Sequence, residues 1–466
     1  MLRIFDPVGT TLCDRVNRRQ WLQIGGIGLG GLTLPKLFEQ RAKGGSAGNG
    51  PAKSVIILFN GGGIPHHETW DPKPDAPPEI RGDFGVIQTK VPGMLVGELM
   101  PLTAQITDKV AVIRTMVTGD QAHSSSGYQM LTGVPHIPLS RENAKPGRPN
   151  DAPSLNALVQ YLRPSRGGLP SSIVLPRRMA NNGGRDPWPG TDAGAMGRKY
   201  DPWFLVCNPN EKGFTVPGAK LPEGLDPLRV DKRFSLLEQV NQHLDHLEKT
   251  AAARDYNIHA ERAISLLTGG KARDAFNLEK EPEKVRERYG MTRHAQSALL
   301  ARRLVEAGVS MVQVNAVSED PTRPNSGGWD THSKHSESLK GWLMPNMDKL
   351  FSALITDLDE RGMLDETLVA WVAEFGHTPR INKNAGRDHW GRVFSIALAG
   401  GGIKGGVIHG TSDGHAAYPL GDVVTPADYL ATVLHCMGYE PETPYTDMQG
   451  RPIPISRGEP VKSVLA

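Results

Sequence analysis

Cysteine is scarce in this chain of 466 residues, which contains only Cys13, Cys207 and Cys436. A disulfide framework or a thiolate metal site needs more cysteines than these, so neither is predicted. Any bound metal would have to be held by histidine and carboxylate groups. Such ligands favour zinc, calcium, magnesium or manganese.

An excess of one charge is also lacking. The formal net charge is only +3, and residues 1–45 alone carry seven Lys and Arg against three acids. The rest of the chain is therefore close to neutral and has no long basic run. Without a basic field, nucleic-acid binding is not expected.

A hydrophobic run long enough for a membrane span is missing near the N-terminus. The apolar stretch over residues 24–34 is short and rich in glycine, and Arg18 and Arg19 stand just before it. Paired arginines ahead of a weakly apolar stretch predict a twin-arginine signal over residues 1–45, read by the twin-arginine export machinery. The alternative is a buried glycine-rich helix after a chance arginine pair.

Export through this signal predicts a periplasmic or extracellular protein. The small residues at 44–50 are the expected cleavage region, although no clear cleavage motif stands there. An uncleaved signal that serves as an anchor is the alternative, but no stable transmembrane span is predicted.

Strand and helix patterns alternate along the rest of the chain. Residues 54–59 are a continuous apolar, β-branched run that ends in a glycine-rich turn, which is typical of a buried strand. Further strands are predicted at 110–114, 172–175, 310–314, 367–373 and 394–399, and helices at 155–162, 298–307 and 344–361. This order predicts a wound α/β sheet with flanking helices over residues 52–466, with function at the carboxyl ends of the strands.

One long segment interrupts this alternation. Residues 180–225 are rich in glycine, proline and asparagine without periodicity, and residues 229–273 have the apolar spacing of a helix. We therefore predict an irregular and helical insertion at about 180–290.

Histidine and carboxylate residues follow several predicted strands. They are His66, His67, Glu68 and Asp71; Asp330, His332 and His335; Glu374; Asp388 and His389; and Asp413 and His415. Repetition of this pattern at one sheet edge favours a metal site, and Asp330 and His332 are spaced to face one ion. The alternative is chance, because these residue types are common in loops and the chain has 15 histidines.

Six motifs carry a family resemblance. They are Gly62–Pro74, His123–Gly133, Gly327–His332, Glu374–Pro379, Gly386–Trp390 and Ala399–Gly405. Their order resembles the alkaline phosphatase and sulfatase superfamily, specifically its exported branch known as the domain-of-unknown-function 1501 family. The resemblance covers nearly the whole chain and implies an alkaline-phosphatase-like fold with two divalent cations, such as zinc, calcium or manganese.

The resemblance also implies roles for individual residues. The expected metal ligands are His66, Glu68, Asp330, His332, Glu374 and His389. The nucleophile of the superfamily stands ten residues before the glycine that matches Gly133, and this position is His123. The catalytic candidates are therefore Ser124, shifted by one place, or His123 as a metal ligand or phosphoryl acceptor. The alternative is that a serine at 124–126 only caps a helix.

Three positions depart from the superfamily pattern. Asn60 stands where a carboxylate is usual, Phe375 replaces a histidine, and His377 replaces the arginine that is usual in this branch. The nearest candidates for binding an anionic substrate are then Arg387 and Lys404.

Together these features predict an exported metal-dependent hydrolase of phosphate or sulfate esters, similar to sulfatases and phosphatases. The missing nucleophile supports a second hypothesis. In it, the protein is a catalytically inactive exported binding or scaffold protein for an anionic or polysaccharide ligand.

Overall fold

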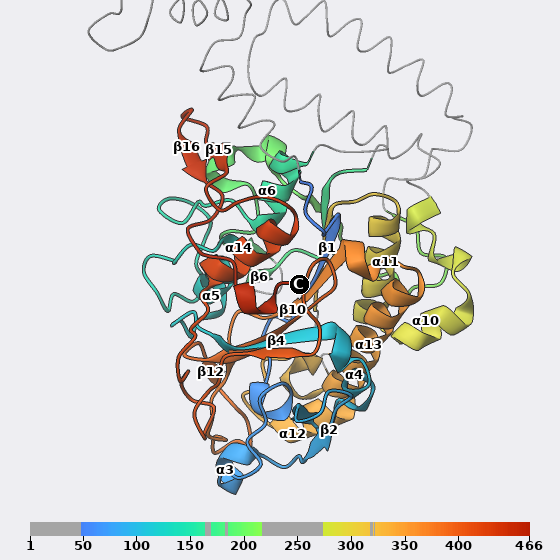
Figure 1. Cartoon of the computed structure of the whole chain (residues 1–466), viewed down its shortest axis with the longest axis vertical. Coiled ribbons are helices and arrows are strands. Elements are labelled where there is room, and N and C mark those ends of the chain that lie inside the picture. The colour runs from blue at the N-terminus through green and yellow to red at the C-terminus, as the bar shows by residue number, and fades with distance from the viewer. Residues whose placement is uncertain (1–47, 164–168, 182–184, 217–273, 317–319, 321) are drawn as a thin grey trace, which may run out of the picture. The chain divides into compact units, whose positions relative to one another are not determined.

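A computed structural model describes residues 48–163, 169–181, 185–216, 274–316, 320 and 322–466 (Figure 1). The predicted signal segment with Arg18 and Arg19, and the predicted helix at 229–273, lie outside these residues. In the part of the chain that is described, no helix has the length and apolar character of a membrane span.

An eight-stranded sheet organises the described chain. Its order is β14–β4–β13–β10–β1–β9–β5–β8. The bounds are β1 Ser54–Phe59, β4 Val110–Met116, β5 Ser172–Leu175, β8 Trp203–Phe204, β9 Met311–Asn315, β10 Thr367–Val372, β13 Phe394–Ala399 and β14 Val407–His409. The predicted α/β fold class is confirmed, and each strand predicted from an apolar run is present.

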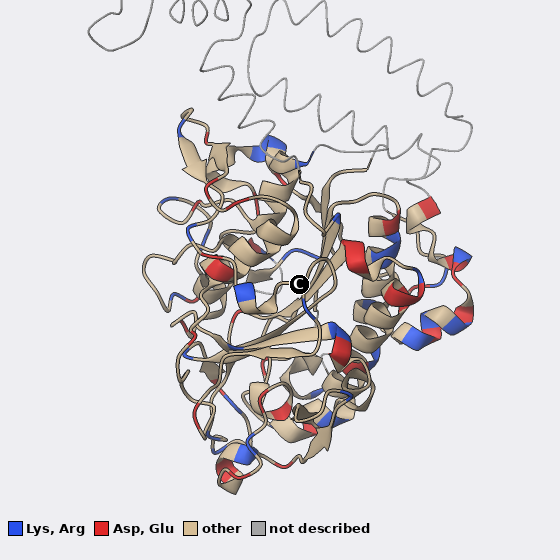
Figure 2. Cartoon of the chain, viewed as in Figure 1, with Lys and Arg blue, Asp and Glu red and all other residues tan. Residues whose placement is uncertain are grey.

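Apolar residues alternate between the two faces of β1, as the two-residue period of a strand requires. Ile56 and Leu58 enter one hydrophobic core, whereas Val55, Ile57 and Phe59 enter the other. Both faces of the sheet are therefore covered, which explains why the strand reads as a continuous apolar run. Figure 2 shows the central strands nearly free of charged residues.

Helices cover both faces of the sheet (Figure 1). The first core includes residues of α10 Glu283–Tyr289, α11 Arg293–Glu306 and α13 Met344–Glu360, and the second includes residues of α5 His123–Thr132, α6 Leu155–Leu162 and α14 Pro426–Cys436. The other described α-helices are short: α3 Pro78–Arg81, α4 Pro101–Ala104 and α12 His335–Ser338. The predicted helix at 298–307 starts earlier, because Thr292 caps α11 by accepting from the backbone N–H of Ala295.

Four two-stranded pairs lie outside the main sheet. They are β2 Val86–Gln88 with β3 Leu95–Gly97, β6 Ala180–Asn181 with β7 Asp186–Pro187, β11 Gly376–His377 with β12 His389–Trp390, and β15 Pro444–Thr446 with β16 Pro452–Pro454. Within the predicted irregular insertion, β8 is an edge strand of the main sheet rather than a loop.

The strand β13 runs antiparallel to both of its neighbours, β10 and β4. The residues that precede β13 therefore lie at the carboxyl edge of the parallel strands, and the glycine-rich segment 400–406 lies at the opposite edge. The predicted wound α/β sheet is thus mostly parallel, with β13 as the reversed strand. An apolar run has the same appearance in either strand direction, so the sequence did not distinguish them.

We predict that Arg302 stabilises the packing of α11 and α13. Its fully buried guanidinium pairs with Glu281 at 2.8 Å and with Asp357 at 2.9 Å, and both carboxylates are also buried. Arg302→Ala would remove the only fully buried cation from both carboxylates, which would keep the partly exposed Arg288, Arg303 and Arg361. This change should lower the free energy of unfolding by about 3 kcal/mol.

Urea denaturation measures this loss. The control is Arg380→Ala, which breaks an exposed ion pair with Glu79 and should cost about 1 kcal/mol or less. Equal losses for the two variants would contradict the prediction.

Candidate metal centre

Four of the predicted site residues converge on a fifth, the carboxylate of Asp330. Its Oδ1 lies 2.8 Å from His389 Nε2 and 2.9 Å from His332 Nε2, and its Oδ2 lies 3.2 Å from His123 Nε2. Glu374 joins through His123, whose Nδ1 lies 2.8 Å from Glu374 Oε1. The structure thus brings together loops that are far apart in the chain.

The sheet supplies these residues from neighbouring strand ends. Glu374 follows β10, His123 is the first residue of α5 after β4, and Asp330 lies beyond β9. His389 belongs to β12, which leads into β13. It reaches the site because β13 is reversed, so the start of this strand lies at the same edge as the ends of its neighbours.

Close backbone approach holds the loops together at Gly62. This residue has a φ of +112°, and a Cβ atom there would lie 2.5 Å from the backbone nitrogen of Asp330. Its N–H donates to Glu374 Oε1 at 2.8 Å. Glycine has no Cβ atom, so it adopts this positive φ readily and leaves room for the backbone of Asp330. Any other residue would displace the Asp330 loop.

The two histidines nearest Asp330 are oriented by outer acceptors. His389 Nδ1 lies 2.7 Å from the carbonyl oxygen of Gln121, and His332 Nδ1 lies 2.7 Å from Asp388 Oδ1. Each Nδ1 must carry a hydrogen to donate to its acceptor. The Nε2 atoms then face Asp330, which is the outer-partner pattern of histidine metal ligands.

A positive charge must lie between Asp330 and these nitrogens. An unprotonated Nε2 and a carboxylate oxygen are both acceptors, and they repel each other at 2.8 or 2.9 Å. Either the imidazoles are protonated or a cation is bound by all of them.

The pKa values follow from this arrangement when no cation is bound. The hydrogen bond to Asp330 raises the pKa of His332 to about 9, with a further contribution from Asp388. Burial opposes a charge on His123, but hydrogen bonds to Asp330 and Glu374 outweigh it and raise its pKa to about 10. Burial also opposes a charge on Asp330. Hydrogen bonds from the three histidines outweigh burial and keep the pKa of Asp330 well below its usual range.

Two groups of side chains have the spacing to hold a metal ion. One is Asp330, His332 and His389, and the other is His123, Glu142 and His389; within each group the ligand atoms lie within 4.8 Å of one another. Two imidazole nitrogens and a carboxylate suit zinc or manganese. Since both groups use His389, whose Nδ1 is already bonded, they compete for one Nε2 atom. The expected number of two cations stays a prediction.

Glu68 and Arg387 lie outside the cluster and form a buried ion pair. The guanidinium of Arg387 donates from Nε and from one terminal nitrogen to Glu68, and its remaining hydrogens go to carbonyl oxygens of Ile80, Thr378 and Pro379. All five donors are thus used, which leaves Arg387 none for a substrate. Burial disfavours a charge on Glu68, but Arg387 and His335 outweigh it and keep its pKa well below the usual range.

His66 is also placed elsewhere. Its Nε2 lies 2.9 Å from the carbonyl oxygen of Ala416, and His67 Nε2 lies 2.8 Å from that of His415. Both imidazoles are buried, and they hold the loop that contains Asp413 and His415. Neither belongs to a metal-spaced group among the described residues.

Ser124 and Lys404 do not face the cluster. The buried Ser124 hydroxyl donates to the carbonyl oxygen of Arg141 and accepts from the N–H of Ala144, both at 2.9 Å, so it anchors the loop after α5. Lys404 is exposed in the segment after β13, at the opposite edge of the sheet. The antiparallel direction of β13 is the reason for that displacement.

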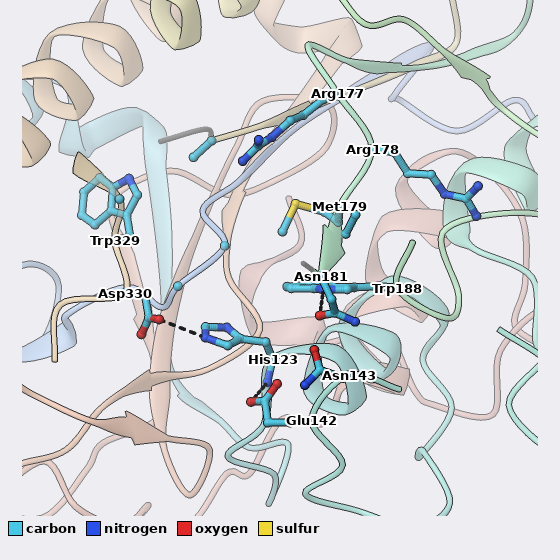
Figure 3. A pocket seen from close by; sticks show the side chains of 15 residues that line it. His123, Glu142, Asn143, Arg177, Arg178, Met179, Asn181, Trp188, Trp329 and Asp330 are labelled. Carbon is cyan, nitrogen blue, oxygen red and sulfur yellow. Dashed lines mark hydrogen bonds and ion pairs between the residues drawn. The ribbon is translucent and has the colours of Figure 1, made fainter. Parts of the chain in front are cut away.

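A cavity of about 300 Å³ opens beside the cluster (Figure 3). Its lining residues are Gly61, Gly62, His123, Glu142, Asn143, Arg177, Arg178, Met179, Ala180, Asn181, Trp188, Ala316, Gly328, Trp329 and Asp330. Glu142, whose Oε1 accepts from the backbone N–H of His123 at 2.8 Å, was not among the predicted residues. It lies in a loop without periodicity, so no sequence pattern marked it.

We predict that the metal-free protein loses stability as the pH rises through the alkaline range. The pKa of His332 is raised from 6.5 to about 9 in the folded state. Its contribution to stability is therefore complete below pH 6.5 and disappears as the pH passes about 9. Urea unfolding of chelator-treated protein at several pH values measures this loss.

His332→Gln is the matched variant and should show a smaller decrease over that range. Adding zinc should reverse the trend, because metal binding displaces protons and becomes stronger as the pH rises. An identical pH dependence in wild type and variant would contradict the protonated cluster.

Several solved structures are similar to this chain. A sulfatase from Pseudoalteromonas sp. is 11% identical, with 89% of this chain and 72% of that chain covered and a TM-score of 0.38. A phosphonate monoester hydrolase from Silicibacter pomeroyi is 12% identical, with 88% and 76% covered and a TM-score of 0.39. A lipoteichoic acid synthase from Listeria monocytogenes is 9% identical, with 84% and 73% covered and a TM-score of 0.37. Such distant similarity carries no conclusion about activity.

No curated protein matches the chain. A family model does match, over residues 52–465, and its description is "Protein of unknown function (DUF1501)". The match begins seven residues after the N-terminal segment 1–45 that the sequence predicts to be an export signal. The chain therefore belongs to this family, as the resemblance of its motifs predicted.

Proposed function

We propose that the protein is an exported metal-dependent hydrolase of phosphate or sulfate esters. The observation that carries the proposal is the Asp330 cluster, in which two histidines with anchored Nδ1 atoms turn Nε2 toward one carboxylate oxygen. Export is supported by the arginine pair Arg18 and Arg19 ahead of a weakly apolar stretch.

The residues of the cluster fit a single divalent cation. Asp330, His332 and His389 would hold zinc, manganese or calcium, of which zinc or manganese best suits the two nitrogen ligands. When bound, such an ion polarises an ester oxygen and stabilises the charge that develops on it. Asp388 and the carbonyl of Gln121 keep the two imidazoles in the required orientation.

His123 is the candidate acid–base group. Glu374 accepts from its Nδ1, so its Nε2 is the atom that takes or gives a proton at the cavity. With a cation in place of the cluster's protons, His123 Nε2 would be unprotonated. We propose that water then attacks the phosphorus or sulfur atom while His123 Nε2 takes its proton, and that the bond to the alcohol oxygen breaks as His123 returns this proton to the alcohol. Ser124 is not assigned as nucleophile, because its hydroxyl is bonded to the loop at 141–144.

The second candidate function is an inactive exported protein that binds an anionic or polysaccharide ligand. It is favoured by the composition of the cavity, since its described lining contains no serine, threonine or cysteine. A covalent intermediate on a hydroxyl or thiol is therefore not supported there.

Metal analysis tests the centre directly. We expect the purified protein to bind one equivalent of zinc or manganese, and His389→Ala to abolish binding because it removes a ligand. Asp388→Asn should weaken binding about 10–100-fold, the usual effect of losing a group that orients a ligand.

His435→Ala is the control, because this half-exposed histidine of α14 lies outside both metal-spaced groups. Elemental analysis and calorimetric titration give the stoichiometry and affinity. Unchanged metal content in His389→Ala would contradict the proposed centre.

Activity against chromogenic phosphate and sulfate esters, with zinc, calcium or manganese added, separates the two functions. We expect metal-dependent turnover that His123→Ala lowers about 10²–10⁴-fold, the usual effect of removing a general acid or base. Ser124→Ala should retain activity wherever circular dichroism shows an intact fold.

An equal loss in folded Ser124→Ala would contradict the assignment of His123. Binding of the esters by the wild-type protein without any turnover would instead support the binding or scaffold function.

A further inference from the structure

Two adjacent arginines line the cavity, and their side chains differ in direction. Arg178 turns away from the cluster (Figure 3), where it bonds Thr191 Oγ1 at 2.6 Å and pairs with Asp192 Oδ2 at 2.7 Å. Arg177 extends into the cavity on the side of Trp329. In the described part of the chain, no hydrogen bond or ion pair of the Arg177 guanidinium is found.

The backbone of Arg177 is held firmly by the sheet. Its carbonyl oxygen accepts from Asn315 Nδ2 at 2.7 Å, and Asn315 Oδ1 accepts from Gln313 Nε2 at 2.8 Å. Asn315 is fully buried at the end of β9. The position of Arg177 at the cavity is thus set by the rigid core.

A second cation beside Arg177 also lacks a carboxylate. Arg293 donates to the carbonyl oxygens of Cys207 at 2.8 Å and Pro176 at 3.3 Å, and no described acid pairs with it. Burial and the charge of Arg293 lower the pKa of Arg177. A partly buried cation without a counter-charge is costly, and an anionic ligand removes that cost.

Arg177 lies across the cavity from His123 and Glu142 (Figure 3). It bonds to no member of the Asp330 cluster. The cavity therefore contains a positive charge that is separate from the metal-spaced groups. Arginine is suited to this task because its planar fork binds carboxylate, sulfate and phosphate groups in a bidentate way.

We propose that Arg177 binds a second anionic group on the substrate, so that the protein selects esters of acidic compounds over esters of neutral ones. This inference rests on the proposed function, because the metal centre is taken to hold the ester that reacts. Arg177 then determines specificity at the other end of the cavity.

Calorimetric titration of the zinc-loaded full chain tests the proposal without turnover. The probes are benzylphosphonate, with one anionic group, and its 4-carboxy and 4-sulfo derivatives, with two. We expect the two-group probes to bind about 10–100-fold more tightly, since a hydrogen bond to a charged group contributes about 1.5–3 kcal/mol. The derivative that gains more identifies the preferred second group.

Arg177→Gln should abolish this preference and leave benzylphosphonate affinity unchanged, and Arg177→Lys should retain part of it. Arg380→Gln, which removes an exposed arginine paired with Glu79, is the control and should behave as wild type. The lysine variant keeps the positive charge, so it also serves where the glutamine variant fails to fold.

Two results would overturn the proposal and leave the proposed function standing. In one, the protein binds zinc, but the zinc-loaded wild type binds all three probes with equal affinity. In the other, Arg177→Gln keeps the preference for the two-group probes. If the wild-type protein binds no zinc at all, the proposed function is overturned, and this inference with it.

Discussion

A single carboxylate in contact with three imidazole nitrogens is the constraint on which the site depends. Asp330 receives His332, His389 and His123 at 2.8 to 3.2 Å, and these distances require positive charge between the groups. Protons supply it when no metal is bound, and a cation supplies it otherwise. The same geometry therefore raises the pKa of His123 and His332 when no metal is bound. Once the protons are lost, it presents the same atoms to a metal ion.

The fold is arranged so that these groups can meet. Parallel strands bring the loops after β1, β4, β9 and β10 to one edge of the sheet, where α/β proteins usually place their sites. The reversed strand β13 adds the residues that precede it, including His389, and carries Lys404 to the other edge. The direction of this one strand thus decides which loop contributes a residue to the cluster.

Buried polar pairs outside the cluster hold the loops that surround it. Arg387 and Glu68 link the segment before β12 to the loop after β1, and His66 and His67 hold the loop at 413–416. These side chains were candidates for chemistry because of their type. Arg387 uses all its donors in this pairing and in bonds to carbonyl oxygens, as a buried charge requires. His66 and His67 each bond a loop carbonyl through Nε2, whereas their Nδ1 atoms have no hydrogen-bond partner among the described residues.

The sequence predicted the sheet well because its strands are buried on both faces and read as apolar runs. It also singled out His123, Asp330, His332, Glu374 and His389, which stand near predicted strand ends in specific motifs. It could not predict that Arg387 pairs with Glu68, because such contacts depend on loops more than 300 residues apart in the chain. Glu142 had no signal, since it lies in a segment without periodicity and is brought to the cavity only by tertiary packing. Arg177 follows the predicted strand at 172–175, but the predictions at the strand ends concerned only histidine and carboxylate residues.

Anomalous X-ray diffraction from crystals grown with zinc tests the central claim most directly. The account predicts one strong peak bounded by Asp330 Oδ1, His332 Nε2 and His389 Nε2, about 2.0–2.2 Å from each atom. Absence of a peak there, with the three side chains still in hydrogen-bond contact, would contradict a metal centre and leave a protonated histidine–carboxylate cluster in its place.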